Sequence, residues 1–232
     1  MKKILIVDDE KDIVETLSFM LKAKGFDCIC AYDGEEGLSL AKNTNPDLVI
    51  LDVMMPKING YKICRLLKFD NKYKNIPIIM ITARSQDEDK IIGEETGADE
   101  YITKPFEIEE LKARVLALLN RANLAPKSMR VKELLAVGDI VLIPESYSVK
   151  FGEKIVKLTP IEFEIFNVLV QNHSKMVSSK DLLKDIWGYE EEESIDTIRV
   201  HIKHIRTKIA KATDKNYIET IYGGGYKLNP NG

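Results

Sequence analysis

Leu48-Val49-Ile50-Leu51-Asp52 is the stretch that decides the fold class of the first half of this chain. Four consecutive apolar residues between Pro46 and Pro56 are typical of a short strand buried on both faces. An aspartate that ends such a strand lies at the edge where open parallel sheets bind their ligands. Asp52 is therefore a candidate nucleophile or metal ligand, although an aspartate also commonly caps a turn, and the strand alone leaves both interpretations open.

The composition is that of a folded protein with two domains. The chain has 232 residues, 44% hydrophobic and 31% charged, which is enough for two domains of roughly 100 residues each. Only four apolar residues follow Lys3 before Asp8, so we expect neither a membrane segment nor a secretory one, and we predict a cytoplasmic protein. The three cysteines lack metal-ligand spacing and are interpreted as core residues.

Charge is distributed unevenly along the chain. Residues 1–121 carry 18 Lys and Arg against 22 Asp and Glu, and the remainder carries 16 against 15, which together give the net charge of −3. Residues 197–232 alone hold seven basic and two acidic side chains. An acidic first half and a basic end indicate different partners for the two halves.

The first half alternates strand and helix patterns. We predict strands at 3–7, 26–32, 48–52, 76–82 and 100–103, and five helices, among them 34–42, 87–96 and 107–121. This alternation predicts a doubly wound α/β domain with five parallel strands. Four of the strands end in polar side chains: Asp8 and Asp9, Asp52, Thr82, and Lys104. Because clustered carboxylates repel one another, this edge of the sheet favours a bound cation.

These segments resemble the receiver domain of bacterial two-component response regulators over residues 1–121. The motifs that carry the resemblance are Ile4-Leu-Ile-Val-Asp8-Asp9-Glu10, Asp47-Leu-Val-Ile-Leu-Asp52-Val-Met-Met-Pro56, Ile81-Thr82-Ala83 and Lys104-Pro105-Phe106. The resemblance implies a flavodoxin-like strand order, the order found in a chemotaxis receiver.

The resemblance also assigns chemistry to the edge of the sheet. Asp52 would accept a phosphoryl group from a sensor histidine kinase. Mg²⁺ would be held by Asp9, by Asp8 through water, by Asp52 and by the backbone carbonyl of Met54, as suits an octahedral ion that keeps several waters. Lys104 would pair with a phosphoryl oxygen, and we expect a cis bond before Pro105 to direct it inward.

A switch and a dimer surface follow from the same resemblance. Thr82 would hydrogen-bond the phosphoryl group and Tyr101 would turn inward into the space left behind. Phosphorylation would then promote a symmetric homodimer. The residues expected to form ion pairs between the subunits are Lys90 with Glu110, Glu100 with Arg114, and Asp99 with Arg121; the alternative interpretation is that these are solvated surface charges.

Residues 122–131 are predicted to be a linker because they are small, polar and interrupted by Pro126. Beyond them, strand patterns occupy 135–142, 146–151 and 154–158. Thr159-Pro160 is a strong helix start, and another helix runs from Ser179 to Gly188. The acidic loop 190–193 is too negative for DNA, so we interpret it as solvated or as facing RNA polymerase.

The last long helix carries Ile198, Ile202, Ile205 and Ile209 as a buried stripe. A helical projection places Arg199, Lys203 and Arg206 beside this stripe. The same projection puts Val200, His201, His204 and Lys208 on the opposite face. A β-hairpin is expected at 217–228, with Gly223-Gly224-Gly225 in its turn.

Residues 132–229 resemble the winged-helix effector domain of the OmpR/PhoB family, and we place this domain at 132–232. The motifs are Leu158-Thr-Pro-Ile-Glu-Phe163, Val200-His-Ile-Lys-His-Ile-Arg206 and Tyr222-Gly-Gly-Gly-Tyr226. The resemblance implies an α+β fold in which the last helix would read the major groove of promoter DNA. The residues expected to contact DNA are Thr197, Arg199, Val200, His201, Lys203, His204, Arg206, Tyr222 and Lys227.

The sequence departs from the family pattern on this surface. The family usually has Arg at the positions of Asp196, His204 and Tyr222, and Asp at the position of Arg199. The base preference of other members therefore does not transfer to this chain.

The predicted function is a phosphorylation-controlled transcription regulator and not an enzyme. A phosphatase that used Asp52 as its nucleophile would typically carry a second aspartate two residues later, where this chain has Met54. The alternative is a DNA-binding regulator with a vestigial receiver, and a response of DNA affinity to a phosphoryl mimic distinguishes the two.

Overall fold

The structure is a computed structural model that describes residues 1–83, 96–128, 136–188 and 195–232. The chain divides into two compact units, Met1–Ala122 and Asn123–Gly232, and each is described by itself. Among the described helices, none combines the length and the apolar character that crossing a membrane requires.

The first unit contains the predicted parallel sheet. Its strands are β1 (Lys3–Val7), β2 (Asp27–Ala31), β3 (Leu48–Asp52), β4 (Ile78–Ala83) and β5 (Glu100–Lys104). They are ordered β2-β1-β3-β4-β5 and every pairing is parallel. This is the flavodoxin-like order, so the predicted fold class of this unit is confirmed.

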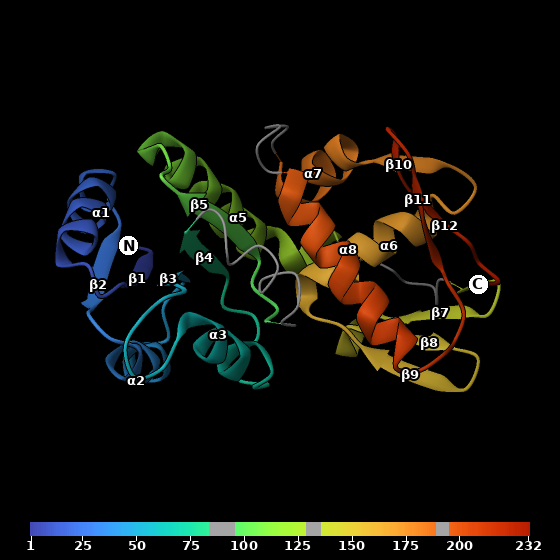
Figure 1. Cartoon of the computed structure of the whole chain (residues 1–232), viewed down its shortest axis with the longest axis horizontal. Coiled ribbons are helices and arrows are strands. Elements are labelled where there is room, and N and C mark those ends of the chain that lie inside the picture. Colours follow the sequence, from blue (N-terminus) through green and yellow to red (C-terminus); the bar gives the residue numbers. More distant parts are fainter. Residues whose placement is uncertain (84–95, 129–135, 189–194) are drawn as a thin grey trace. The chain divides into compact units, whose positions relative to one another are not determined.

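Helices cover both faces of the sheet. They are α1 (Lys11–Ala23), α2 (Gly34–Thr44), α3 (Gly60–Lys68) and α5 (Ile108–Ser128). Figure 1 shows α1 and α5 on one side of the sheet and α2 and α3 on the other. The predicted helix at 87–96 lies almost wholly outside the described residues.

Helix α5 continues past its predicted end at Arg121 and stops at Ser128, so the first part of the predicted linker is helical. The presence of Pro126 suggested a break there. A proline so close to the end of a helix removes a single N–H donor and leaves most of the preceding backbone bonds intact.

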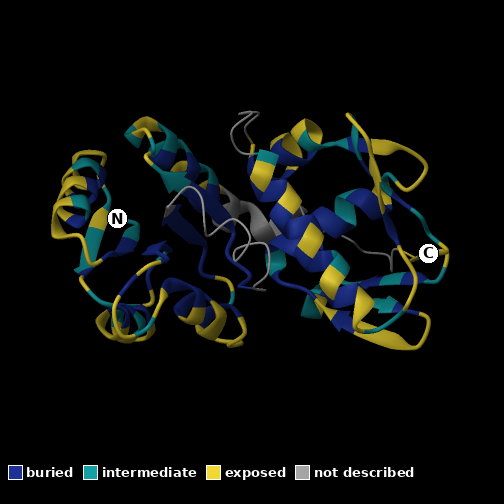
Figure 2. Ribbon diagram, viewed as in Figure 1, coloured by how far each residue is buried: buried dark blue, intermediate teal, exposed yellow. Residues whose placement is uncertain are grey.

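The core of the first unit lies around the central strand β3 and its neighbours β1 and β4. Every residue of β3 is buried, and so are the last four of β1. Figure 2 shows the sheet as mainly buried, with the exposed residues on the outer sides of the helices. Apolar runs that are buried on both faces are what the sequence of β3 predicted.

Within its described residues, the second unit has two antiparallel sheets, three α-helices and a short 3-10 helix, η1 (Pro144–Ser146). A four-stranded sheet joins β6 (Ala136–Val137), β7 (Ile140–Ile143), β8 (Ser148–Phe151) and β9 (Lys154–Lys157). The helices are α6 (Pro160–Gln171), α7 (Ser179–Trp187) and α8 (Ile195–Ala210). A three-stranded sheet, ordered β10-β12-β11, contains β10 (Met176–Ser178), β11 (Ile218–Ile221) and β12 (Gly225–Leu228). This is the predicted α+β winged-helix architecture.

Local signals explain most of these boundaries. Thr159 is the N-cap of α6, with Pro160 as its first residue. Gly188 ends α7 in the left-handed conformation, with φ of 80°. The strand predicted at 135–142 is instead two strands, because Gly138 has φ of 62° and turns the chain between them.

Candidate functional site

Three carboxylates meet at the carboxyl edge of the parallel sheet, as predicted. Asp8 and Asp9 follow β1, and Asp52 ends β3. One oxygen from each of the three lies within 4.8 Å of the others. Asp8 and Asp52 are buried, whereas Asp9 is exposed. A set of hard oxygen ligands that is open to solvent on one side suits a divalent cation that keeps some of its waters.

Lys104 is the cation that faces this cluster. Its Nζ lies 2.9 Å from Asp52 Oδ1, 3.1 Å from Asp8 Oδ2 and 3.0 Å from Glu10 Oε1. The peptide bond between Lys104 and Pro105 is cis, which confirms that expectation. Lys104 therefore reaches the acidic cluster from the end of β5.

The second oxygen of Asp52 is fixed by the backbone. Met54 N donates to Asp52 Oδ2 at 2.6 Å. Burial raises the pKa of Asp52 to about 6, and the proximity of Asp8 acts in the same direction, while the hydrogen bond from Lys104 opposes it. The negative charge of Asp52 is thus held in a pocket that destabilises it, and an added cation would stabilise it.

The loop after Asp52 is positioned by a glycine that the sequence analysis did not single out. A Cβ on Gly60 would lie 2.2 Å from the carbonyl oxygen of Asp52. Gly60 N also donates to Val53 O at 3.0 Å. Because only glycine permits this approach, Gly60 brings the start of α3 against the carboxyl end of β3. The position of Gly60, eight residues after the candidate nucleophile, gave no signal without the fold.

A shallow depression of about 530 Å³ opens beside the cluster. Its lining includes Asp9, Met54, Pro56 and Tyr61. The side chain of Met54 is 61% exposed. The depression leaves the exposed carboxylate of the cluster accessible to a ligand or partner.

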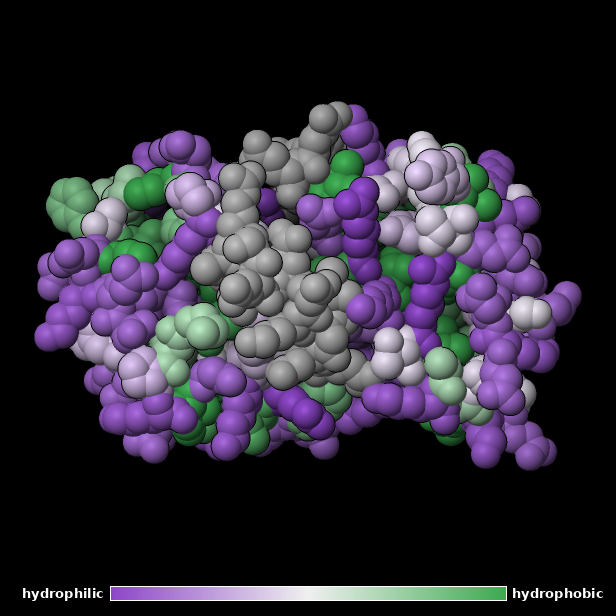
Figure 3. Space-filling view, viewed as in Figure 1, coloured by the Kyte–Doolittle hydropathy of each residue, from purple (hydrophilic) through white to green (hydrophobic). Residues whose placement is uncertain are grey.

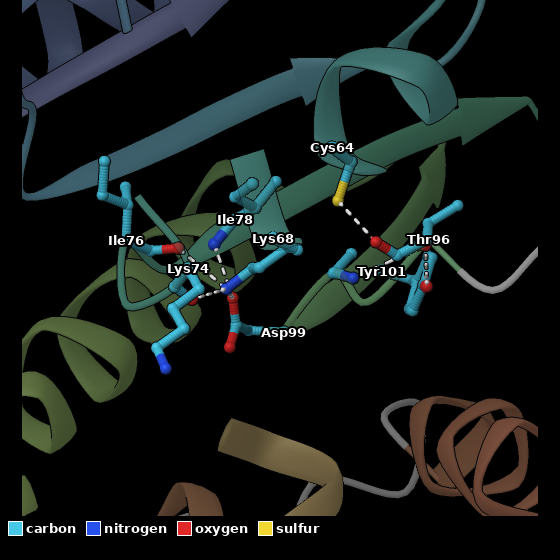
Figure 4. Close-up of polar contacts among 9 residues, drawn as sticks. Cys64, Lys68, Lys74, Ile76, Ile78, Thr96, Asp99 and Tyr101 are labelled. Carbon is cyan, nitrogen blue, oxygen red and sulfur yellow. Dashed lines mark hydrogen bonds and ion pairs between the residues drawn. The ribbon is translucent and has the colours of Figure 1, made fainter. Parts of the chain in front are cut away.

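The two predicted switch residues are both buried. Thr82 lies in β4 and pairs in register with Thr103 of β5, and it is 1% exposed. Tyr101 is also buried, and its hydroxyl lies 2.8 Å from Thr96 Oγ1. Figure 4 shows these two hydroxyl groups facing each other. The inward position of Tyr101 therefore involves Thr96, a residue that the sequence analysis did not assign.

The charges that were predicted to pair between subunits pair within one chain. Arg114 Nη1 lies 2.8 Å from Glu100 Oε1, and its Nη2 lies 2.5 Å from Glu110 Oε1. Asp99 forms an ion pair with Lys68, as Figure 4 shows. Arg114, Glu100 and Asp99 are all buried.

The alternative interpretation, that these are solvated surface charges, is therefore wrong for Asp99, Glu100 and Arg114; their pairing between subunits in the phosphorylated form stays a prediction. Isolated buried charges are costly, so each is paired with a neighbour in its own fold. Lys90 and the side chain of Arg121 lie outside the described residues.

The solvent-facing side of α8 is narrower than predicted. Thr197, Val200, His201, His204 and Lys208 are buried. The prediction that these residues, apart from Thr197, lie on an exposed face is therefore wrong. Both α6 and α7 pack on α8, so the helix buries about half of its circumference and not only the isoleucine stripe. The ring of Trp187 in α7 lies against His201, with ring centroids 5.8 Å apart.

A buried ion pair fixes α8 to α6. Lys208 Nζ lies 2.6 Å from Glu162 Oε2. The same oxygen accepts a hydrogen bond from Thr159 N at 2.8 Å. Lys208 is thus a structural residue, although the sequence analysis counted it among the exposed residues of α8.

Arg199 and Lys203 are the exposed cations of α8. Arg199 Nη1 lies 2.7 Å from Asp196 Oδ1, so two of the four departures from the family pattern face each other. Figure 3 shows hydrophilic residues along the outward side of α8. Tyr222 is fully exposed at the turn of the β11–β12 hairpin, and Lys227 is partly exposed in β12.

Both units match known families. Residues 4–116 match the response regulator receiver domain, and residues 152–228 match the family described as transcriptional regulatory protein, C terminal. The DNA-binding dual master transcriptional regulator RpaA of Synechocystis is 43% identical over 98% of this chain and 95% of its own. The alkaline phosphatase synthesis transcriptional regulatory protein PhoP of Bacillus subtilis is 41% identical, over 98% of this chain and 96% of its own.

A solved structure resembles the whole chain. A cysteine-to-serine mutant of RitR has a TM-score of 0.74 at 25% identity, covering 99% of both chains. The same family is indicated by the domain matches, by the two full-length relatives and by the strand order of the first unit. The chain belongs to the OmpR/PhoB family of two-component response regulators, which join a receiver domain to a winged-helix transcriptional effector domain.

Proposed function

We propose that this chain regulates transcription through phosphorylation of Asp52 by a sensor histidine kinase in the cytoplasm. The observation that carries the proposal is the contact of Lys104 Nζ with Asp52 Oδ1 at 2.9 Å, beside Asp8 and Asp9. This arrangement provides a carboxylate to attack, a cation to pair with an incoming phosphoryl oxygen, and oxygen ligands for a metal.

Asp8, Asp9, Asp52 and the carbonyl of Met54 would hold Mg²⁺. When bound, this ion would neutralise charge on the phosphoryl oxygens. The chain itself contributes the nucleophile, which is the carboxylate of Asp52. Met54 N donates a hydrogen bond to one of its oxygens, and the other oxygen faces Lys104. Transfer forms an acyl phosphate on Asp52 and releases the kinase histidine. Lys104 would then pair with a phosphoryl oxygen in place of its present contact with the Asp52 carboxylate.

Thr82 and Tyr101 would transmit the change. A phosphoryl group on Asp52 offers an acceptor to the Thr82 hydroxyl, and Tyr101 already lies in a buried position that Thr96 stabilises. We propose that phosphorylation favours this arrangement and a receiver homodimer. Because Arg114, Glu100 and Asp99 are paired within their own chain, the dimer would form with these pairs intact or exchanged between subunits.

The second unit would bind double-stranded promoter DNA. Arg199 and Lys203 on α8 and Tyr222 on the hairpin are exposed and could approach the phosphates and bases. Two receivers in a dimer raise the effective concentration of the second effector domain at a repeated half-site. Binding should weaken steeply with salt because phosphate contacts supply much of the affinity.

A phosphotransfer assay tests the first step. The chain is incubated with Mg²⁺ and a small acyl phosphate, and its intact mass is measured. We expect one added phosphoryl group on the wild type and none on Asp52→Asn or on the wild type in chelator. A modification that survives Asp52→Asn would show that Asp52 is not the acceptor, and a receiver that is never modified would favour the vestigial alternative.

A further inference from the structure

Arg206 is the third basic residue of α8 that was expected to contact DNA, but the structure gives it other partners. Its Nε and Nη2 donate to the carbonyl oxygen of Ile218 at 3.1 and 2.7 Å. Its Nη2 also donates to Thr220 Oγ1 at 2.8 Å. These bonds use three of the five N–H donors of a guanidinium.

Ile218 and Thr220 belong to β11, the first strand of the hairpin. In the antiparallel ladder, Thr220 pairs with Tyr226 of β12. The Cζ atom of Arg206 lies 6.0 Å from the centre of the Tyr226 ring. Arg206 therefore contacts both strands of the hairpin from one position on α8.

Lys203, one turn earlier on the same helix, provides the contrast. It is exposed, and among the described residues its ammonium group forms no ion pair or hydrogen bond. The two cations lie on adjacent turns of one helix, yet one is directed to solvent and the other is fixed to a strand.

We propose that Arg206 is a positioning residue that sets the placement of the β11–β12 hairpin relative to α8, and so determines how the helix and the hairpin contact DNA together. This inference rests on the proposed DNA-binding function. The planar guanidinium of Arg206 donates two N–H groups to one carbonyl oxygen, which fixes both the distance and the direction of β11 from α8. A lysine ammonium cannot reproduce this geometry. Tyr222, at the turn of the same hairpin, would be positioned through these contacts of Arg206 with β11 and β12.

The test uses the full-length chain and begins without DNA. Amide hydrogen exchange in β11 and β12 is compared among the wild type, Arg206→Lys, Arg206→Gln and the matched control Lys203→Gln. We expect exchange in the hairpin to be about tenfold faster in both Arg206 variants, since each loses charge-assisted hydrogen bonds, and unchanged in Lys203→Gln. Thr220→Val removes one acceptor only and should give a smaller increase. Hairpin exchange that is unchanged in both Arg206 variants would overturn the proposal.

A second arm measures binding to a mixed-sequence DNA duplex over a range of salt concentrations. Lys203→Gln should lower the salt dependence by about one counterion. Arg206→Lys keeps its charge, so a phosphate-contacting residue would tolerate it, whereas a positioning residue would not. We expect Arg206→Lys to weaken binding as much as Arg206→Gln does.

Two outcomes of the second arm separate the inference from the proposed function. Wild-type affinity in Arg206→Lys together with a lower salt slope in Arg206→Gln would identify Arg206 as a phosphate contact and overturn the proposal. A wild type that binds no duplex would instead contradict the proposed function, and the exchange data would still decide whether Arg206 fixes the hairpin.

Discussion

The acidic pocket of the receiver unit and the outer face of α8 use charge in opposite ways. In the pocket, Asp8 and Asp52 are buried, and burial raises the pKa of Asp52 to about 6. On α8, Arg199 and Lys203 stay exposed to solvent. A buried carboxylate cluster responds strongly to an added cation or phosphoryl group, whereas exposed cations bind an anionic partner with little cost of desolvation. The pocket is suited to sensing a modification and the helix to binding a polyanion.

The largest expected effect compares two lysines of α8. Lys208→Ala leaves Glu162 buried without this ion pair, so we expect a loss of about 3–5 kcal/mol in the free energy of unfolding of the second unit. Lys203→Ala is on the exposed side of the same helix and should change stability by less than about 0.5 kcal/mol. Urea denaturation of both variants tests this, and equal effects would contradict the division of α8 into structural and exposed cations.

The next effect concerns Gly60. Gly60→Ala would place a methyl group 2.2 Å from the carbonyl oxygen of Asp52. Since backbone must shift to accept it, we expect the receiver to lose about 3 kcal/mol of stability and phosphorylation of Asp52 to slow. Lys62→Ala, at an exposed position of α3, is the control. A Gly60→Ala variant with wild-type denaturation would show that the loop after Asp52 can adapt.

A smaller effect tests the charge state of the pocket. Burial raises the pKa of Asp52 to about 6 in the folded chain, against 3.8 for an ordinary aspartate side chain. A raised pKa means that Asp52 contributes stability when protonated, and this contribution is lost as the pH rises from about 4 to about 6. We therefore expect Asp52→Asn to stabilise the metal-free chain by about 2 kcal/mol at neutral pH.

The pH dependence provides the control for this prediction. The gain in stability of Asp52→Asn over the wild type should shrink towards zero near pH 4, where Asp52 in the folded wild type is protonated and therefore as neutral as the asparagine. Adding Mg²⁺ at neutral pH should stabilise the wild type more than the variant. If thermal denaturation shows a destabilised variant at neutral pH, the pairing with Lys104 outweighs burial and the description of the pocket is wrong.

The smallest stability effect is expected at the exposed pair of Asp196 and Arg199. Asp196→Ala should change stability by no more than about 0.5 kcal/mol, because exposed pairs contribute little. It should nevertheless strengthen binding to DNA, since it removes a negative charge from beside Arg199. Fluorescence anisotropy with a labelled duplex measures this. Weaker binding by Asp196→Ala would indicate that Asp196 orients Arg199 productively.

The contrast between the two regions also explains which features could be predicted from the sequence. The pocket was predictable because parallel strands that end in Asp8, Asp52 and Lys104 must bring those ends to one edge. The positions of the strands were therefore sufficient to place the side chains. The close approach of Gly60 to Asp52 and the contact of Thr96 with Tyr101 depend on tertiary packing, and no local pattern marked them.

Periodicity was less informative for α8. It identified the isoleucine stripe correctly, but it treated the rest of the helix as exposed. The projection could not show that α6 and α7 both pack on α8, nor that Glu162 would draw Lys208 inward. For the same reason, Arg114 and Glu100 looked like surface charges in sequence and are a buried pair in the fold.

The measurement that tests the central claim most directly is the affinity of the chain for duplexes that the wild type selects from a random library. It is made with and without Mg²⁺ and beryllofluoride, for the wild type and for Asp52→Asn. We predict that the mimic tightens binding by the wild type within the range of about 5- to 150-fold that is typical of coupled sites and leaves Asp52→Asn unchanged. Equal affinity with and without the mimic in the wild type, or the same gain in Asp52→Asn, would contradict control of DNA binding through Asp52.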